Sequence, residues 1–558
     1  MRRTHLFKDK QVLGGSPRDS INRFALVNFP RKTCPQTLTR HPLVGVTMKK
    51  SKSKANGSAV LKDQRCSSGV EGLDDILTGG LPRDCFYLIQ GDPGSGKTTL
   101  ALQFLLEGVR CGESVFYVTL SETREELLKV TRSHGWSLEA LPLLELSSIE
   151  QLLRPEEQTT VFRPSEIELN KVSKLLIDEV SKRRPARIVF DSLSEFRLLA
   201  ETALRYRREL LNLKRHFAQT RSTVLLLDDK MTGGVIGTDP HVLSLSHGVV
   251  EMEQLSPDYG KSRRRLRVLK LRGVKFREGY HDYTIETGGL RVFPRLVAAE
   301  HYTKMEREPV SSGIKELDDL FGGGLDRGTT TLILGTAGTG KSTLALQYAR
   351  QMASKGDRGI LFCFDETRSI MLARAKALGL DLEKHVKSGM IVAQQVDPAE
   401  ISPGEFAARI REHVEGGCKL VVIDTLNGYL NAMPGEKYLA NQLHELVTYL
   451  NYQGVMTILI LAQHGLVSAA ESPVDLSYLS DTVVNLRYFE AAGEVRQSIA
   501  VIKKRSGRHE KTIREFKLES GRGIRVGQPL KEFHGVLTGM PMFRGGTGEI
   551  MPPSDGKK

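Results

Sequence analysis

The sequence predicts an α/β fold made of two similar domains in tandem, each a mainly parallel sheet flanked by helices. Two observations lead to this prediction. A glycine-rich stretch typical of phosphate binding occurs twice, as GDPGSGKT at residues 91–98 and as GTAGTGKS at residues 335–342. Around each copy, short apolar runs of strand length alternate with longer segments of helical period. This alternation favours parallel strands joined by helices.

The first glycine-rich stretch has the context that a phosphate-binding loop (P-loop) requires. An apolar run at 86–89 precedes it, and Leu102, Leu105 and Leu106 give the segment after it an apolar helical face. In a P-loop the backbone N–H groups surround phosphate oxygens, the lysine reaches the β- and γ-phosphates, and the Ser or Thr hydroxyl binds Mg²⁺. A chance match is the alternative, and the flanking strand and helix patterns argue against it. We therefore predict ATP and Mg²⁺ as cofactors. The predicted nucleotide-binding residues are Gly91, Asp92, Pro93, Gly94, Ser95, Gly96, Lys97, Thr98 and Thr99 in the first copy, and Gly335, Thr336, Ala337, Gly338, Thr339, Gly340, Lys341, Ser342 and Thr343 in the second.

The duplication extends well beyond the two loops. Residues 67–123 align with residues 311–367 without a gap, and 24 of the 57 aligned positions are identical. Ser-Ser-Gly, Leu-Asp-Asp, Gly-Gly-Leu and Thr-Leu-Ala-Leu-Gln recur in register. Such self-similarity indicates that one domain has been duplicated. We predict an N-terminal extension over 1–62, domains over 63–300 and 301–530, and a flexible C-terminal tail over 531–558.

Each domain contains a second nucleotide-binding signal, a buried strand that ends in an acid. Ile188-Val189-Phe190-Asp191 is the first such strand, and Val421-Val422-Ile423-Asp424 is the second. Many buried strands end in Asp, but at this distance after a P-loop the pattern is specific for a Walker B carboxylate that holds the Mg²⁺ shell. The predicted metal-binding residues are Thr98, Asp191, Ser342 and Asp424.

Composition and charge narrow the class of protein. The chain has 558 residues and a formal net charge of +14, of which residues 1–62 carry +12, with 14 Lys and Arg against Asp9 and Asp19. The rest of the chain is close to neutral, so nucleic-acid binding by the ATPase body is not favoured. No apolar run approaches the roughly 18 residues of a membrane helix, and the six cysteines have no metal-binding spacing. We expect a soluble, cytoplasmic protein.

The basic segment 1–62 allows several interpretations. It lacks a sustained hydrophobic period and is rich in Ser, Thr and Pro, which is typical of disorder. The run that begins at Met48 resembles a natural protein start, so residues 1–47 are interpreted first as an upstream misread of the gene. A plain disordered tail is the second interpretation and a basic binding arm is the third. A transit peptide has weaker support, because no amphipathic stripe is present.

Basic residues gather near the end of each domain. Lys270 and Arg272 alternate on one face of a strand, so both could reach a single phosphate group. Lys503-Lys504-Arg505 is the basic run near the end of the second domain. For the run Arg263-Arg264-Arg265 the preferred interpretation is a solvated edge strand.

Together these motifs resemble the KaiC family of circadian-clock ATPases, over about residues 65–535. The resemblance rests on the tandem P-loops, the repeated Ser-Ser-Gly-x-x-x-Leu-Asp-Asp opening, Lys-Leu-Arg-Gly at 270–273, and the stretch from Leu479-Ser480-Asp481 to Ile513-Arg514-Glu515-Phe516. It implies RecA-like domains and a double-ringed homohexamer with ATP at subunit boundaries. It also implies ATP hydrolysis mainly in the first domain and phosphate transfer to the chain's own Ser or Thr residues in the second. Residues expected to reach the neighbour's nucleotide are Lys270, Arg272, Lys503 and Arg505.

The chain departs from the family pattern at two places. The family's Glu-Glu pair after the strand that follows the P-loop helix is Ser121-Glu122 here in the first domain and Asp365-Glu366 in the second. The candidates for orienting or activating the attacking group are therefore Glu122, Asp365 and Glu366. The family's Ser-Thr phosphorylation pair aligns with Ser477-Tyr478, which leaves Ser477 as the candidate phosphoacceptor.

The sequence thus predicts a KaiC-like ATPase with serine/threonine autokinase activity in its second domain, acting as a nucleotide-driven ring with an unknown signalling protein as partner. One alternative is a RecA/RadA-type recombination ATPase that acts on DNA. It would need a basic groove in the body, which the near-neutral charge does not suggest. The other alternative is a nucleotide-switched scaffold with little turnover, which the altered Glu pair favours.

Overall fold

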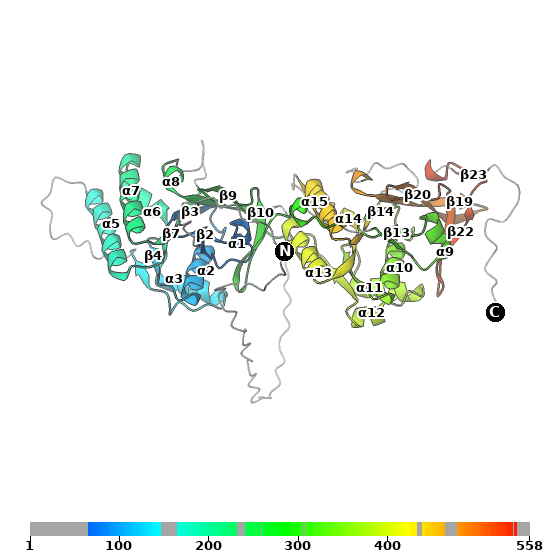
Figure 1. Cartoon of the computed structure of the whole chain (residues 1–558), viewed down its shortest axis with the longest axis horizontal. Helices are drawn as coiled ribbons and strands as arrows, with labels where there is room; N and C mark the ends of the chain where they lie inside the picture. Colours follow the sequence, from blue (N-terminus) through cyan, green and yellow to red (C-terminus); the bar gives the residue numbers. More distant parts are fainter. Residues whose placement is uncertain are drawn as a thin grey trace, which may run out of the picture. The chain divides into compact units, whose positions relative to one another are not determined.

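The computed structural model describes residues 65–146, 164–230, 240–257, 259–304, 307–431, 438–463, 477–538 and 541–543. They contain two large sheets, one in each predicted domain, called here domain one and domain two (Figure 1). The residues predicted as an N-terminal extension lie outside the described part of the chain.

The sheet of domain one has nine strands in the order β11-β10-β9-β8-β3-β7-β6-β4-β5. The strands from β8 to β5 pair in parallel, whereas β9, β10 and β11 add an antiparallel extension at one end. The strand bounds are β3 Phe86–Gly91, β4 Val115–Thr119, β5 Leu143–Glu145, β6 Arg187–Asp191, β7 Thr223–Asp229, β8 Gly248–Leu255, β9 Arg263–Leu271, β10 His281–Glu286 and β11 Gly289–Phe293.

Helices cover both faces of this sheet because its central strands are apolar on both sides. Every residue of β3 and β6 is buried, as expected for a parallel sheet between two helical layers. One core cluster joins the sheet to α2, and the other joins it to α5, α6 and α7, which Figure 1 shows grouped together in cyan and green. The helix bounds are α1 Leu73–Ile76, α2 Lys97–Arg110, α3 Arg124–Ser133, α5 Pro164–Arg183, α6 Leu193–Ala200, α7 Ala203–Gln219 and α8 Pro240–Leu245.

Domain two repeats this arrangement, with strand order β16-β15-β17-β18-β14-β19-β20-β21-β22. Its strands are β14 Thr330–Gly335, β15 Arg358–Cys363, β16 Ile391–Gln395, β17 Cys418–Asp424, β18 Met456–Ala462, β19 Thr482–Ala491, β20 Glu494–Lys504, β21 Arg514–Glu519 and β22 Gly523–Pro529. Its helices are α9 Lys315–Leu320, α10 Lys341–Ser354, α11 Arg368–Ala377, α12 Glu383–Lys387, α13 Pro403–Glu415, α14 Leu426–Asn431 and α15 Leu439–Tyr452. Shorter pieces complete the described chain: β1 Arg65–Cys66, β2 Leu81–Pro82, η1 Ala298–His301, β12 Pro309–Val310, β13 Leu325–Asp326, η2 Ser477–Leu479, β23 Phe533–His534, η3 Val536–Thr538 and β24 Met542–Phe543.

The two nine-stranded sheets flanked by helices confirm the predicted fold class. In domain one, β3, β6 and β7 run in parallel and end at Gly91, Asp191 and Asp229. The carboxyl ends of such strands meet at one edge of the sheet, where ligands of open α/β sheets bind. The P-loop and the Walker B acid are therefore neighbours in space, although a hundred residues separate them in the chain.

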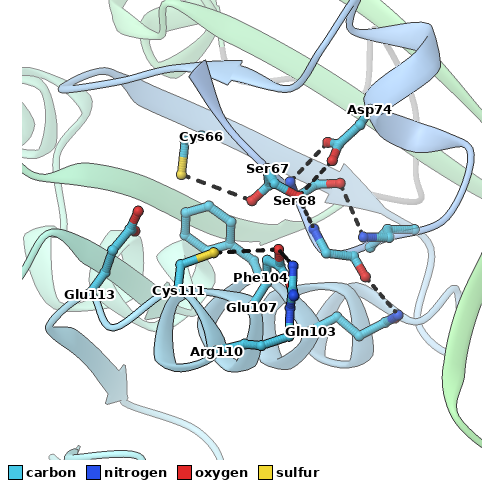
Figure 2. A network of polar contacts seen from close by, with 12 residues as sticks. Cys66, Ser67, Ser68, Asp74, Gln103, Phe104, Glu107, Arg110, Cys111 and Glu113 are labelled. Atoms are coloured by element: carbon cyan, nitrogen blue, oxygen red, sulfur yellow. Dashed lines mark hydrogen bonds and ion pairs between the residues drawn. The ribbon is translucent and has the colours of Figure 1, made fainter. Parts of the chain in front are cut away.

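The repeated Ser-Ser-Gly-x-x-x-Leu-Asp-Asp motif fastens the start of each domain. In domain one the Asp74 carboxylate accepts hydrogen bonds from the Ser67 hydroxyl at 2.7 Å and from the Ser68 amide at 2.8 Å. Gln103, on the helix that follows the P-loop, donates to the Gly69 carbonyl. Figure 2 shows this network lying along α2. In domain two Asp318 accepts the same two bonds from Ser311 and Ser312. The motif therefore holds an N-terminal segment against the P-loop helix.

The run Arg263-Arg264-Arg265 was expected on a solvated edge strand, but β9 pairs with β8 on one side and with β10 on the other. That expectation is wrong, because the strands after β9 continue the sheet. Part of the predicted tail has structure: β23 pairs with β24, and Val536 is buried in a small cluster with Leu530. Within the described ranges, no helix is both long and apolar enough to cross a membrane.

Candidate functional site

The first P-loop has the backbone that a phosphate cradle needs. Gly94 and Gly96 adopt φ values of +78° and +91°, which favour glycine. A Cβ atom at Gly96 would lie 2.5 Å from the Cδ1 atom of Ile285, so that side chain would have to shift to admit one. Helix α2 begins directly after Gly96, at Lys97. Its first amides and its dipole point at the loop and favour an anion.

Lys97 holds three acceptors at the start of this helix. Its Nζ atom donates to the carbonyl oxygens of Gly91 and Asp92, each at 3.0 Å. It also forms an ion pair of 2.8 Å with an oxygen of Asp229, the last residue of β7. The Lys97 side chain is largely buried and the Asp229 side chain is half exposed. Sequence reasoning did not single out Asp229.

The predicted Mg²⁺ ligands of domain one lie together. The Thr98 hydroxyl is 3.3 Å from Oδ2 of Asp191 and 3.4 Å from Oε1 of Glu122. The Tyr117 hydroxyl donates to Oδ2 of Asp191 at 2.7 Å. Burial raises the pKa of Asp191. Burial and the negative charge of Asp191 raise the pKa of Glu122 to about 7. Two carboxyls and a hydroxyl thus face one point beside the P-loop, where a divalent cation would offset their mutual repulsion.

Domain two repeats the cradle with different neighbours. Gly338 and Gly340 again have positive φ values, and Lys341 begins α10. Lys341 donates to the Thr336 carbonyl at 2.7 Å, and burial lowers its pKa. Burial also raises the pKa of Asp424, while a hydrogen bond from Ser342 acts in the opposite direction. Ser342 and Asp424, the two predicted metal ligands of this domain, are therefore in contact.

The carboxylates predicted to act in domain two are engaged differently from Glu122. Glu366 forms an ion pair with Arg374 of α11, at 2.6 Å, and Asp365 accepts a short hydrogen bond from the Thr425 hydroxyl. The structure therefore places Asp365 beside the residue that follows the Walker B acid, and places Glu366 against a cation of its own domain. Glu122 and Glu366 align in the duplication but have different partners.

The four basic residues expected to reach a neighbour's nucleotide bind backbone carbonyls in their own domains. Lys270 donates to the carbonyl of Leu243 at 2.5 Å, and Arg272 donates to that of Ser244 at 2.7 Å. In domain two the corresponding bonds run from Lys503 to Ser477 at 2.8 Å and from Arg505 to Tyr478 at 3.4 Å. The two pairs thus occupy equivalent places: Lys270 and Arg272 bind helix α8, which precedes β8, and Lys503 and Arg505 bind the short helix η2, which precedes β19.

Ser477 begins η2, and residues 477–480 form one turn of the chain before β19. Its backbone carbonyl accepts from Lys503, and the residue is partly exposed. Tyr478 beside it is exposed, whereas Ser480 is fully buried. Lys503 also donates to the carbonyl of Ser480 at 2.8 Å, so one ammonium group joins both ends of the turn.

Buried polar atoms test whether these residues fit a nucleotide and a metal. Oε2 of Glu122 and the hydroxyl of Ser95 in domain one, like that of Thr336 in domain two, are buried and have no hydrogen-bond partner within the described ranges. Ligands or ordered water normally pair with such atoms, which also occur away from the P-loops, as at Ser173 and Thr457. Phosphate oxygens and metal-bound waters would supply the missing partners. The donor set of carboxylates and hydroxyls also suits Mg²⁺.

The fold and these sites define a protein with two P-loop nucleotide-binding domains in tandem. A comparison with protein families agrees and is more specific. The family model described as ATPase: KaiC matches residues 66–297 and again residues 310–531. The chain therefore belongs to the KaiC family, as the motifs predicted, and that family binds nucleotide.

Individual relatives are similar over most of the chain. The circadian clock oscillator protein KaiC of Acaryochloris marina is 27% identical over 498 residues, which cover 88% of this chain and 94% of the relative. KaiC of Synechococcus elongatus is 28% identical, covering 85% of this chain and 91% of the relative. The circadian clock protein KaiC3 of a Synechocystis species is 27% identical, covering 86% and 95%.

Proposed function

We propose that the chain binds MgATP at both P-loops and hydrolyses it, and that domain two also transfers phosphate to Ser477. The observation that carries the first part is the gathering of Lys97, Thr98, Asp191 and Glu122 at one edge of the first sheet. Lys97 would hold the β- and γ-phosphates, and Thr98 and Asp191 would hold Mg²⁺. The metal would neutralise charge on the phosphates.

In domain one we assign the water-activating role to Glu122. Attack of water on the γ-phosphorus forms a P–O bond and breaks the bond to the ADP oxygen, and the water loses a proton. A base is most effective when its pKa lies near the working pH. Burial brings the pKa of Glu122 to about 7, and its Oε2 atom has no other partner in the described part of the chain. Ser121 cannot take this role because it carries no carboxylate.

The proposed autokinase reaction rests on the position of Ser477. Lys503 donates to the Ser477 carbonyl, and the family resemblance implies that Lys503 reaches a neighbour's nucleotide. A nucleotide reached by Lys503 would then lie near the Ser477 hydroxyl. Transfer would join that oxygen to the γ-phosphorus, release ADP and pass the hydroxyl proton to a carboxylate. Asp365 is our candidate for that carboxylate, because Glu366 is already paired with Arg374.

Calorimetry and phosphate release test the ATPase proposal. Wild type should bind two ATP molecules per chain, and Lys97→Ala and Lys341→Ala should each remove one of them. Glu122→Gln in a Lys341→Ala background should lower phosphate release about 10²- to 10⁴-fold while ATP still binds, since a general base typically contributes that much. Binding at a single wild-type site, or unchanged turnover in Glu122→Gln, would contradict the assignment.

Phosphopeptide mapping after incubation with MgATP tests the kinase proposal. One phosphate is expected on Ser477, absent in Lys341→Ala and in Ser477→Ala. Ser480→Ala is the matched control, because that buried serine lies three residues away in the same turn and should not accept phosphate. An assembled, ATP-hydrolysing protein without phosphate on Ser477 would leave a plain ATPase.

The scaffold alternative would show ATP binding with negligible phosphate release. The DNA alternative would show salt-dependent binding of single-stranded DNA by a chain that starts at Met48. The basic residues of β9 do not favour DNA binding, because Arg265 and Arg267 are paired with Glu253 and Glu251 of β8.

A further inference from the structure

The ion pair between Lys97 and Asp229 concerns the same lysine that the proposed function assigns to the phosphates. In a P-loop the lysine reaches the β- and γ-phosphates. Here an oxygen of Asp229 lies 2.8 Å from its Nζ atom. An ammonium group has three donors, and the carbonyls of Gly91 and Asp92 take two more contacts. All three donors are therefore used before a phosphate arrives.

The backbone around Asp229 holds its carboxylate in this position. Asp229 pairs with Gly91 across β7 and β3, which places it beside the first residue of the P-loop. The amide of Asp229 donates to the Ser194 hydroxyl at 3.4 Å. Its neighbour Asp228 accepts from that hydroxyl and forms an ion pair with Arg197. The Asp-Asp pair is thus attached to α6 on one side and to the P-loop on the other.

Domain two lacks this carboxylate. The residue that pairs with Gly335, the counterpart of Gly91, is Ala462. Its amide donates to the side chain of Asn427, and its carbonyl accepts from the same side chain. Lys341 forms no ion pair with any residue that the structure describes. Among the described residues, the two sites therefore differ by one negative charge beside the P-loop lysine.

We propose that Asp229 is a built-in competitor of the γ-phosphate, which lowers the affinity of the first site for ATP relative to the second. To bind ATP, Lys97 must exchange the carboxylate for phosphate oxygens, and the carboxylate must then lie near a second anion or turn toward solvent. Asp229 is half exposed, so water screens part of this repulsion. Asp229 acts here through Lys97 and is a positioning residue.

The test exchanges the charge between the two sites. It uses the full chain and ATP labelled on its ribose with a fluorescent N-methylanthraniloyl group. Lys341→Ala isolates the first site, and Lys97→Ala isolates the second. In the first background, Asp229→Asn should tighten binding about tenfold, which corresponds to about 1.4 kcal/mol. In the second background, Ala462→Asp should weaken binding by a similar factor.

The outcomes separate this inference from the proposed function on which it rests. A Lys341→Ala chain that binds no labelled ATP would overturn the proposed function. Binding that is unchanged in Asp229→Asn, or weakened with loss of turnover, would overturn the inference and make Asp229 inert or a direct ligand. The fluorescence of Trp136, the one tryptophan of the chain, checks that the variant is folded. Asp229→Ala must give the same sign as Asp229→Asn.

Discussion

Arg187 is a charged residue buried in the core of domain one, with 1% of its surface exposed. It forms an ion pair of 2.5 Å with Glu113, and it donates to the carbonyls of Ser67 and Phe104 at 2.8 Å. Burying a charge costs several kcal/mol unless it is paired, and here Nε donates to Glu113 while Nη1 donates to the two carbonyls. The guanidinium also lies 4.8 Å from the ring centre of Phe104.

Domain two fills the same space with apolar groups. The counterpart of Arg187 in domain two is Leu420, because each of them pairs with the first part of the strand that follows the P-loop helix. A Cβ atom at Gly108 would lie 2.7 Å from Cδ of Arg187, and the residue that aligns with Gly108 is Met352. A glycine with an arginine, or a methionine with a leucine, therefore fills the same gap. Neither choice is visible in the P-loop motif.

Replacing Arg187 should destabilise domain one strongly. Arg187→Met keeps much of the volume but leaves two buried carbonyls without donors, so the loss should be about 3–5 kcal/mol. Arg83→Ala is the matched control, because Arg83 pairs with the same Glu113 but is partly exposed, and it should cost less than about 1 kcal/mol. Urea titration followed by Trp136 fluorescence measures both. Equal losses would show that burial of Arg187 is not the cause.

His281 should make domain one sensitive to acid. Its Nδ1 atom accepts from the Arg295 amide at 2.8 Å, and Nε2 lies 3.0 Å from the Arg277 carbonyl. Only the neutral ring can accept at Nδ1 while donating at Nε2. Burial lowers the pKa of His281 from its ordinary value of 6.5 to about 4. The folded pKa is depressed, so the stabilisation is fully present above pH 6.5 and is lost as the pH falls toward 4.

Between pH 7.5 and pH 5.0 this linkage should remove about 2 kcal/mol of the free energy of unfolding. Urea titrations of wild type and His281→Gln, followed by Trp136 fluorescence, measure the difference between the two pH values. The variant should lose about 2 kcal/mol less than wild type on acidification. A loss of the same size in both proteins would assign the acid sensitivity to other groups.

At the scale of elements, each P-loop helix is held by the segment that begins its domain. The amides of Ser68 and Gly69 donate to Asp74 and Ser67 side chains, and Gln103 of α2 joins the Gly69 carbonyl (Figure 2). In domain two the amides of Ser312 and Gly313 make the corresponding two bonds, whereas Gln347 of α10 donates to the carbonyl of Ser312, one residue before the counterpart of Gly69. The position of α2 or α10, and so of its P-loop, depends on this short segment.

Asp74→Ala should loosen the segment in domain one alone. Amide hydrogen exchange read by mass spectrometry should become faster in a peptide spanning 65–72, because two amides lose or weaken their acceptors. A peptide spanning 309–316 should be unchanged. Asp318→Ala should give the reverse pattern. Faster exchange in both peptides with either variant would mean that these hydrogen bonds do not stabilise each segment independently.

The strand and helix around each P-loop could be predicted from the sequence, because the hydrophobic period and the motif agree there. Phe86–Gly91 and Lys97–Arg110 follow from an apolar run, a glycine loop and a leucine face. The proximity of Asp191 to Thr98 also followed, since parallel strands end at one edge. The sequence did not predict that β9 lies inside the sheet, because the charges of Arg263-Arg264-Arg265 suggested a strand exposed to solvent at the sheet edge. Some of the acids that pair with the β9 arginines lie on β8. A pattern of charges along one strand does not show whether further strands extend the sheet beyond it.

Some site contacts were equally invisible in the sequence. An acid at a strand end, such as Asp229, can face solvent or the site, and only the structure places it on Lys97. Arg374 lies eight residues after Glu366, which is outside the three- and four-residue spacing of helical pairs. Tertiary packing decides both contacts.

At the scale of the whole molecule, the chain joins two related sites with unlike surroundings. In domain one the Glu122 carboxyl has a pKa of about 7, and Asp229 forms an ion pair with the P-loop lysine Lys97. In domain two Glu366 is paired with Arg374, and Lys341 donates to a carbonyl and forms no ion pair within the described ranges. Two sites that differ in this way are suited to different rates or different phosphate acceptors. A division of labour between hydrolysis and phosphate transfer agrees with the proposed function.

Two exposed arginines are candidates for contacts between subunits. Arg272 and Arg505 are exposed, and each binds one backbone carbonyl of its own domain. A guanidinium has five donors, so one such bond leaves others for a phosphate. If these residues reach a neighbour's nucleotide, ATP becomes part of the contact between subunits and stabilises the ring by mass action.

Multi-angle light scattering should therefore show a hexamer at micromolar concentration with saturating MgATP, and smaller species without nucleotide. Arg272→Ala with Arg505→Ala should weaken the hexamer although both sites still bind ATP, because the substitutions remove only the contact between subunits. Lys517→Ala, which removes an exposed cation of β21, is the control and should leave assembly unchanged. A monomer in saturating MgATP would exclude the ring, and a hexamer that persists in the double variant would assign the contact to other residues.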